Sequence, residues 1–345
     1  YADAAGVAAR LMKTNRRLSQ DKADWLAQHW ARPGPDGQWR ILGDAAHKVI
    51  NPYLYHVEET LEMYRRISAP VLAVEASDDS LTQWWKGRYD LNEYHQRRDL
   101  PAEPGTSQLS AYLAAGVISI RQCLHAALGY NQGELDSGST GVTTWINELL
   151  WREFYKHILV GYPRVSMYRA FRPETEALAW RNAPQELKAW QQGRTGFPII
   201  DAAMRQLLHT GWMHNRLRMI VAMFLSKNLL IDWRKGERHF MRNLIDGDLA
   251  ANNGGWQWSA STGTDAVPYF RIFNPVSQSQ RFDPQGHFIR HWVPELQELD
   301  EKAIHQPIKS TDLFGNTNYL SPIVDLSSSR QRALEAFKGL PRRQN

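Results

Sequence analysis

Apolar residues recur with the 3.6-residue period of an α-helix along most of the chain, most regularly in its second part. This periodicity predicts helices at 107–128, 142–160, 198–209, 212–230 and 234–246. No segment between them shows the alternation of a strand, so we expect this part to be all-helical. The stretch 303–329 is rich in Pro, Ser, Asp and Asn and is expected to be irregular, with a last helix at 330–338.

The beginning of the chain follows another pattern. Helical spacing over 7–32 is followed by Pro33-Gly34-Pro35-Asp36-Gly37, a cluster that predicts a turn. An amphipathic segment at 57–67 then leads into the apolar run Val71–Val74, which is typical of a buried parallel strand. A helix that feeds a buried strand indicates an α/β unit.

These two patterns predict two domains. We expect an incomplete α/β fragment at residues 1–92 and a helical domain at 93–345, with the junction somewhere in 80–98, so the fold class is mainly α. The 345 residues include 14 Trp, 13 Tyr and 11 Phe, and 43% of the chain is apolar. This composition excludes a disordered, collagen-like or coiled-coil chain.

Composition also bounds the environment. Cys123 is the single cysteine, which excludes a disulfide framework and a cysteine-built metal site, so we expect no metal. No apolar stretch is long enough to cross a membrane, and no signal peptide is visible at the N-terminus. A cytoplasmic protein is the default expectation.

The positive charge is concentrated in the helical part. The formal net charge is +5, and residues 1–92 contain 12 Lys and Arg against 12 Asp and Glu, so the surplus lies wholly in 93–345. A basic surplus suits a polyanionic partner such as nucleic acid. A solvated surface with some excess arginine explains it equally well.

Polar residues interrupt the apolar helix predicted from residue 212. Asn215, Arg218 and Met219 are spaced i, i+3 and i+4 and therefore share one face. Arg218 needs a carboxylate partner if that face is buried, and Asp246 and Asp248 are candidates. A polar network that only holds helices together is the alternative, although such networks are costly unless fully satisfied.

The helix predicted at 142–160 carries a second polar cluster. Glu148, Trp151 and Arg152 fall on one face, where they could hydrogen-bond a base, stack on it and hold a phosphate. The simpler interpretation is a Glu148–Arg152 pair on a surface helix with Trp151 in the core, and the spacing alone favours it.

Two glycine-containing segments are suited to close approach. Gly105-Thr106-Ser107-Gln108-Leu109-Ser110 opens a predicted helix, and its hydroxyl and N–H groups could bind an anion such as a pyrophosphate. Ordinary helix capping explains the same residues. Gly254-Gly255 would let the backbone approach a neighbouring group closely.

Two longer motifs are far more specific: Trp212-Met213-His214-Asn215-Arg216-Leu217-Arg218-Met219 and Asp246-Gly247-Asp248-Leu249-Ala250-Ala251-Asn252-Asn253-Gly254-Gly255-Trp256-Gln257-Trp258. With them, the chain from about Tyr94 onward closely resembles the flavin-binding helical domain of DNA photolyases and cryptochromes, most densely over 99–296. Among these it looks most like the bacterial cyclobutane pyrimidine dimer photolyases. The resemblance implies a monomer with one FAD that repairs pyrimidine dimers in damaged DNA, using an electron from photoexcited reduced FAD.

The resemblance also implies which residues hold the flavin. Positions that match contacts to the ribityl and phosphate groups are Tyr94, Thr106, Ser107, Leu109 and Ser110. Positions that match the flavin cavity are Arg152, Arg218, Asp246, Asp248 and Asn252. A cationic Arg218 near the ring would favour a flavin anion, and Asp246 would orient that cation. The Asn252 amide would face flavin N5 and could rotate to serve either protonation state.

Further positions match the DNA site and the electron path. The lesion contacts are Glu148, Trp151, Asn215, Met219 and Trp258, and Arg216 matches a contact to DNA phosphate. Trp256, Trp233 and Trp180 match a relay that passes electrons from the surface to the flavin. With Asn252 and Glu148, these three indoles are the expected catalytic set. Gln108 and Asn228 depart from the family pattern, where relatives often carry Arg and Asp.

Residues 1–92 do not resemble the antenna domain that usually precedes such a domain, so no antenna chromophore is expected. They look instead like part of an α/β-hydrolase, with the strand near Val71–Val74 ending at Asp78 and Asp79. No Gly-x-Ser-x-Gly motif precedes that strand, so we expect no hydrolase activity. A cryptochrome-like photoreceptor and an inactive chimera with a hydrolase fragment are the rival interpretations of the whole chain.

Overall fold

The computed structural model describes residues 1–14, 19–41, 90–265, 271–307 and 319–341. Contacts divide the chain into two units, Tyr1–Pro70 and Val71–Asn345. The boundary between them falls outside the described residues, so the predicted junction in 80–98 stays a prediction. Each unit is considered by itself.

In its described residues, 1–14 and 19–41, the first unit has two helices and a short hairpin. Helices α1 (Ala4–Thr14) and α2 (Gln20–Trp30) share the segment predicted as one helical stretch. Strands β1 (Ala31–Pro33) and β2 (Trp39–Ile41) pair antiparallel across the predicted turn, in which Gly37 adopts a positive φ of 73°. The core between these elements is small and built mostly from alanines: Val7, Ala8, Ala23, Ala27 and Ala31. The predicted helix 57–67 and strand Val71–Val74 lie outside the described residues.

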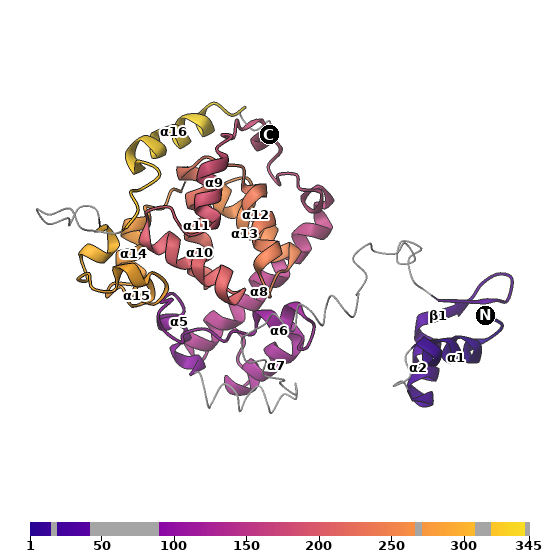
Figure 1. Cartoon of the computed structure of the whole chain (residues 1–345). Helices are drawn as coiled ribbons and strands as arrows, with labels where there is room; N and C mark the ends of the chain where they lie inside the picture. Colours follow the sequence, from indigo (N-terminus) through magenta and orange to yellow (C-terminus); the bar gives the residue numbers. More distant parts are fainter. Residues whose placement is uncertain (15–18, 42–89, 266–270, 308–318, 342–345) are drawn as a thin grey trace, which may run out of the picture. The chain divides into compact units, whose positions relative to one another are not determined.

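Helices make up the regular structure of the second unit in its described parts, as the sequence predicts (Figure 1). The long α8 (Thr140–Gly161) and the helices α10 (Pro198–Thr210), α11 (Asn215–Met223), α12 (Trp233–Asn243) and α13 (Leu249–Ala260) carry most of the predicted site residues. The other elements are η2 (Leu91–Glu93), α5 (Tyr94–Arg97), η3 (Pro163–Met167), η4 (Pro173–Ala177), α9 (Pro184–Gln191), α14 (Pro275–Phe282), α15 (His287–Trp292), η6 (Pro294–Leu296), η7 (Ala303–His305) and α16 (Leu326–Lys338).

The prediction of one continuous helix at 107–128 is wrong. It is divided into α6 (Ser110–Ala114) and α7 (Ile120–Tyr130). Gly116 adopts a left-handed φ of 71° just beyond α6, a conformation that ends a helix. Ser119 then starts α7 with a capping box, in which its hydroxyl accepts from the Gln122 N–H and its own N–H donates to the Gln122 side chain.

The helix predicted at 212–230 is also not α-helical along its whole length. Helix α11 ends at Met223 and continues as one π-helical turn, η5 (Phe224–Asn228). Such turns insert a residue into the helical ladder and often occur at functional sites. Both side chains at the end of this turn, Lys227 and Asn228, are buried.

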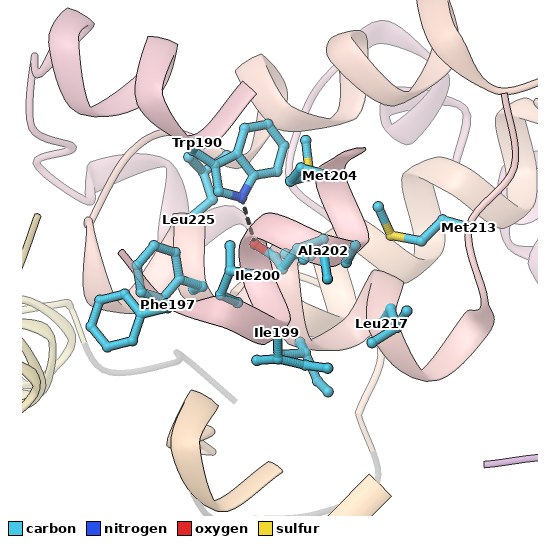
Figure 2. Packing of buried hydrophobic residues seen from close by; sticks show 14 of the residues in the cluster. Trp190, Phe197, Ile199, Ile200, Ala202, Met204, Met213, Leu217 and Leu225 are labelled. Atoms are coloured by element: carbon cyan, nitrogen blue, oxygen red, sulfur yellow. Dashed lines mark hydrogen bonds between the residues drawn. The ribbon is translucent and has the colours of Figure 1, made fainter. Parts of the chain in front are cut away.

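A core of large apolar side chains fixes the central helices. Trp190 of α9 is fully buried and donates its indole N–H to the Val221 carbonyl of α11 at 3.1 Å, the bond drawn in Figure 2. The same apolar cluster includes Ile200 and Met204 of α10 and Leu217 of α11 (Figure 2). In Figure 1, α10 to α13 lie at the centre of this unit. None of the helices in the described parts combines the length and apolar character needed to span a bilayer.

Candidate flavin and DNA site

Helix α8 has a buried side and an exposed side, and the exposed side also carries large apolar residues. Trp145 and Leu149 are buried, with exposed fractions of 4% and 6%, whereas Trp151 is 56% exposed. Trp151 packs edge-to-face against Phe154 at 5.5 Å between ring centroids. The simpler interpretation, which places Trp151 in the core, is therefore wrong, and its indole is available to a ligand.

The two charged residues beside Trp151 do not pair with each other. Glu148 forms an ion pair with Arg98 at 2.8 Å, and Arg152 forms one with Asp248 at 2.9 Å. The simpler interpretation, a Glu148–Arg152 surface pair, is therefore wrong. Burial raises the pKa of the Glu148 carboxyl, and the nearby Arg98 guanidinium partly opposes this.

Asp248 links α8 to the start of α13. Its Oδ1 accepts from the Ala251 N–H at 2.9 Å and caps the helix, while its Oδ2 accepts from Arg152. Because both oxygens are engaged, Arg152 is fixed against the N-terminus of α13. The arrangement positions the last residues of the Asp246–Trp258 motif relative to Trp151.

Arg218 finds the carboxylate that the sequence requires in Asp246. Its Nη2 donates to Asp246 Oδ2 at 2.7 Å, and its Nε donates to the Met213 carbonyl at 2.8 Å. The Asp246 side chain is only 2% exposed, and its Oδ1 has no hydrogen-bond partner in the described structure. A buried acceptor of this kind is costly unless a ligand supplies a donor. The N–H groups of a flavin ring fit that need.

Asn252 is held more tightly than expected. Its Nδ2 donates to the Glu237 carboxylate at 2.9 Å and to the Glu237 carbonyl at 3.1 Å. Both acceptors bind the same NH₂ group, so rotation of the amide would break these two hydrogen bonds. The amide oxygen is left facing away from Glu237, as an acceptor.

Two of the predicted relay residues lie on the neighbouring helices α12 and α13, and Trp180 packs against the apolar cluster that contains both. Trp256 of α13 and Trp233 of α12 are buried, with exposed fractions of 2% and 0%, and Trp180 is partly exposed. Gly236 permits the approach of α12 and α13, since a Cβ at this position would collide with the Trp256 ring. Trp256 also packs edge-to-face against Phe240 at 5.0 Å.

Of the two adjacent glycines in α13, only Gly254 permits the close approach that the sequence predicts. A Cβ on Gly254 would overlap the Tyr155 ring of α8, whereas a Cβ on Gly255 meets no described atom within 4 Å. Gly254 thus lets α8 and α13 pack closely. The close approach serves helix packing.

The residues matched to DNA lie around the start of α11. Asn215 is exposed at the first position of the helix, and Arg216 pairs with Asp99 at 2.8 Å. The Arg216 guanidinium lies 4.4 Å above the Phe282 ring and 4.0 Å from the Met219 sulfur. Trp258, the other predicted lesion contact, is partly buried, with the Arg271 guanidinium 5.0 Å from its ring centroid.

The residues matched to the FAD phosphates surround the start of α6. Leu109 is buried, and Thr106, Ser107 and Ser110 are partly exposed. The Trp212 indole approaches the Ser110 hydroxyl at 3.4 Å, which connects this segment to the α11 motif. Burial raises the pKa of Tyr94, which packs beneath Arg98. Gly105 is required here, because a Cβ would collide with the Arg97 backbone.

Sequence reasoning missed three residues of this region: Arg98, Asp99 and Glu237. Arg98 and Asp99 sit in the charged run directly after Tyr94, and Glu237 lies between Gly236 and a basic residue on α12. Nothing in their spacing points to Glu148, Arg216 or Asn252, from which they are far removed in sequence. Only the fold brings these pairs together.

Comparison with known proteins shows the family to which the chain belongs. Residues 145–339 match the family described as the FAD binding domain of DNA photolyase. The chain belongs to the photolyase/cryptochrome family. It is 56% identical over 247 residues to the deoxyribodipyrimidine photo-lyase of Escherichia coli (strain K12), covering 71% of this chain and 52% of the relative. The photo-lyase of Vibrio cholerae serotype O1 is 49% identical over 305 residues, 88% of this chain and 63% of the relative.

Solved structures agree with this assignment. A bacterial class III photolyase from Agrobacterium tumefaciens matches with a TM-score of 0.69 at 42% identity, covering 76% of this chain and 55% of that one. The cryptochrome of Synechocystis sp. PCC6803 matches with a TM-score of 0.69 at 32% identity, covering 77% and 57%. The chain thus spans little more than half the length of most of these relatives. The predicted helical photolyase fold is confirmed.

The likeness of residues 1–92 to an α/β-hydrolase is not supported. The alignment with the Vibrio cholerae photo-lyase covers 88% of this chain, which is more than residues 93–345 can supply. Photolyase similarity therefore extends into the first 92 residues.

Proposed function

We propose that this chain carries the flavin- and DNA-binding part of an enzyme that repairs cyclobutane pyrimidine dimers with light. One observation carries the proposal. The ion pairs Arg152–Asp248 and Arg218–Asp246 bring together α8, α11 and α13, the helices that hold most residues matched to flavin and lesion. The relatives at 49–56% identity, named deoxyribodipyrimidine photo-lyase, support the same reaction.

FAD would be held by two groups of residues. Tyr94, Thr106, Ser107, Leu109 and Ser110 would bind its ribityl and phosphate groups. Arg152, Arg218, Asp246, Asp248 and Asn252 would surround its ring, where the unpaired Asp246 oxygen needs a donor. When bound, reduced and photoexcited, FAD supplies the single electron that opens the cyclobutane ring.

The protein's own part is positioning and electrostatics. Trp151 offers an exposed indole face for stacking on an extruded base, which is worth about 1–3 kcal/mol per base. Glu148 accepts hydrogen bonds, and its orientation is set by Arg98. Asn215, Met219 and Trp258 would complete the lesion contacts, and Arg216 would contact phosphate after exchanging its bond to Asp99. Photolyases are among the enzymes known to flip bases out of the duplex.

The flavin environment depends on two residues. Arg218 places a positive charge that favours a reduced, anionic ring, and its guanidinium is oriented by Asp246. Asn252 would present its amide oxygen to an N–H donor on the ring, because its NH₂ group is engaged by Glu237. Trp256, Trp233 and Trp180 would deliver electrons from the surface when the flavin must be reduced.

The test is repair of an oligonucleotide that contains one pyrimidine dimer, under blue light, by the chain carrying reduced FAD. We expect light-dependent loss of the dimer and none in darkness. Absence of repair despite bound, reduced FAD would contradict the proposal.

A photoreceptor is the second candidate, because the Synechocystis cryptochrome matches with the same TM-score. The two candidates differ in DNA binding. A repair enzyme prefers dimer-containing DNA over undamaged DNA of the same sequence, and equal affinity for both would favour the photoreceptor.

A further inference from the structure

A guanidinium lies over the ring of the middle relay residue. Arg234 Cζ is 5.0 Å from the ring centroid of Trp233, which is fully buried at the start of α12. In the ground state this contact is attractive, because the indole face is electron-rich. Once Trp233 loses an electron, the ring carries a positive charge and the same contact becomes repulsive.

Arg234 cannot easily swing away from the ring. Its Nη2 donates to Glu176 at 2.7 Å, its Nη1 contacts Asp232 at 3.3 Å, and its Nε donates to the Tyr168 carbonyl at 2.6 Å. Its side chain is only 20% exposed, so water screens the charge incompletely. The guanidinium is therefore a fixed charge beside the indole.

The inner indoles also lack a route for proton release. The ring N–H groups of Trp233 and Trp256 are buried and have no acceptor in the described structure. An oxidised Trp233 therefore stays a cation. The Arg234 guanidinium repels this cation, and the Glu176 and Asp232 carboxylates that pair with Arg234 offset part of the repulsion. Trp180 is partly exposed, so water can take its proton after oxidation.

We propose that Arg234 raises the energy of oxidised Trp233 and so prevents the positive charge from resting in the middle of the relay. This inference rests on the proposed relay. Trp256 gives one electron to the photoexcited flavin, which is the oxidant, and regains one electron from Trp233. Trp233 regains one from Trp180, and the Trp180 cation then releases its ring N–H proton to water. Arg234 makes electron transfer from Trp233 to Trp256 less favourable and electron transfer from Trp180 to Trp233 more favourable.

The experiment is flash excitation of the full chain with bound oxidised FAD, followed by time-resolved absorption of the tryptophan radicals. In Arg234→Gln, we expect the ratio of the protonated Trp233 radical to the deprotonated Trp180 radical to rise roughly three- to tenfold. Arg234→Lys keeps the charge and should stay within about twofold of the parent chain. Arg234→Met removes the charge but keeps an apolar stem, and should repeat the Gln result if the Gln variant folds poorly.

Trp180→Phe separates failure of this inference from failure of the relay. If that variant still yields the deprotonated radical, the proposed relay is wrong. If it abolishes the deprotonated radical but neither charge-removing variant shifts the balance, the role of Arg234 is wrong and the relay stands. An equal shift in the Gln and Lys variants would also overturn the inference, because it would indicate a structural effect and not one of charge.

Discussion

Asn252 donates two hydrogen bonds from a single NH₂ group to the side chain and backbone of Glu237, at 2.9 and 3.1 Å. Burial raises the pKa of the Glu237 carboxyl, and the bond from Asn252 lowers it. The two residues lie on neighbouring helices, α12 and α13, whose close packing depends on Gly236. This relationship fixes which end of the amide is offered to a ligand.

Asn252→Asp should therefore destabilise the fold in a pH-dependent way. The new carboxylate faces Glu237 and cannot donate, so the folded-state pKa values of this pair rise above their unfolded values. Proton binding then favours the folded state, and the deficit relative to the parent chain grows as the pH rises. We expect a loss of about 2–3 kcal/mol at pH 8 and a smaller loss at pH 5, measured by urea unfolding.

Asn252→Ser serves as the control for this prediction. It removes the same amide without adding a charge, so only the Glu237 pKa rises, and its loss of stability should depend less on pH than that of Asn252→Asp. Equal pH profiles for the two variants would show that charge repulsion with Glu237 is not the cause.

The Arg218–Asp246 pair should matter far more for stability than an exposed pair. Arg218→Leu leaves the Asp246 carboxylate, 2% exposed, without its cation, and we expect a loss of about 3–5 kcal/mol. Arg97→Leu breaks pairs with Glu93 and Glu103, whose side chains are 53% and 43% exposed, and should cost less than about 1 kcal/mol. Denaturant unfolding of both variants measures the difference.

Removing both charges of the buried pair tests the cause of that loss. Arg218→Leu combined with Asp246→Asn leaves no buried charge, so part of the lost stability should return. A double variant as unstable as the sum of the single ones would mean that the two side chains act independently.

His214 should make the stability sensitive to mild acid. Its Nδ1 accepts from the Arg216 N–H at the start of α11, and burial, aided by Arg216 and Arg218, lowers the pKa of the imidazole to about 4. Below the unfolded value of about 6.5 the unfolded chain binds a proton that the folded chain does not. Stability therefore falls as the pH drops from about 6.5 to 4, by roughly 3 kcal/mol.

The measurement is the free energy of unfolding between pH 4 and 8. His214→Asn should flatten the slope below pH 6.5, although its absolute stability is lower. The exposed His157, on α8, provides the control variant His157→Asn, which removes an imidazole that does not cap α11. An unchanged slope in the His214 variant would contradict the assignment.

Trp151 lies on the exposed side of α8 and Trp145 on its buried side. Replacing Trp151 should therefore affect DNA binding, and replacing Trp145 should affect stability. Trp151 is 56% exposed, so Trp151→Ala should barely change stability but weaken binding to dimer-containing DNA by about 5- to 150-fold. Trp145 is 4% exposed, and its replacement by Ala should cost about 3–5 kcal/mol of stability. Loss of DNA affinity without loss of stability in the Trp145 variant would overturn this division.

The sequence by itself determined the helical character of the second unit in its described parts. The apolar period of 142–160 predicted α8 almost to its ends, because buried positions repeat with the helical turn. The i, i+3, i+4 spacing of Asn215, Arg218 and Met219 already required a carboxylate for Arg218, which Asp246 provides. Motifs this dense also determined the family.

Only the tertiary structure decided which charged groups meet. Spacing favoured a Glu148–Arg152 pair, but Glu148 pairs with Arg98 and Arg152 with Asp248. Local spacing describes neighbours on one helix, whereas these partners come from other elements, and their approach depends on how the helices pack. The same holds for Asn252 and Glu237, and for the exposure of Trp151. An amphipathic pattern defines two faces, but the packing of the other helices decides which face is covered.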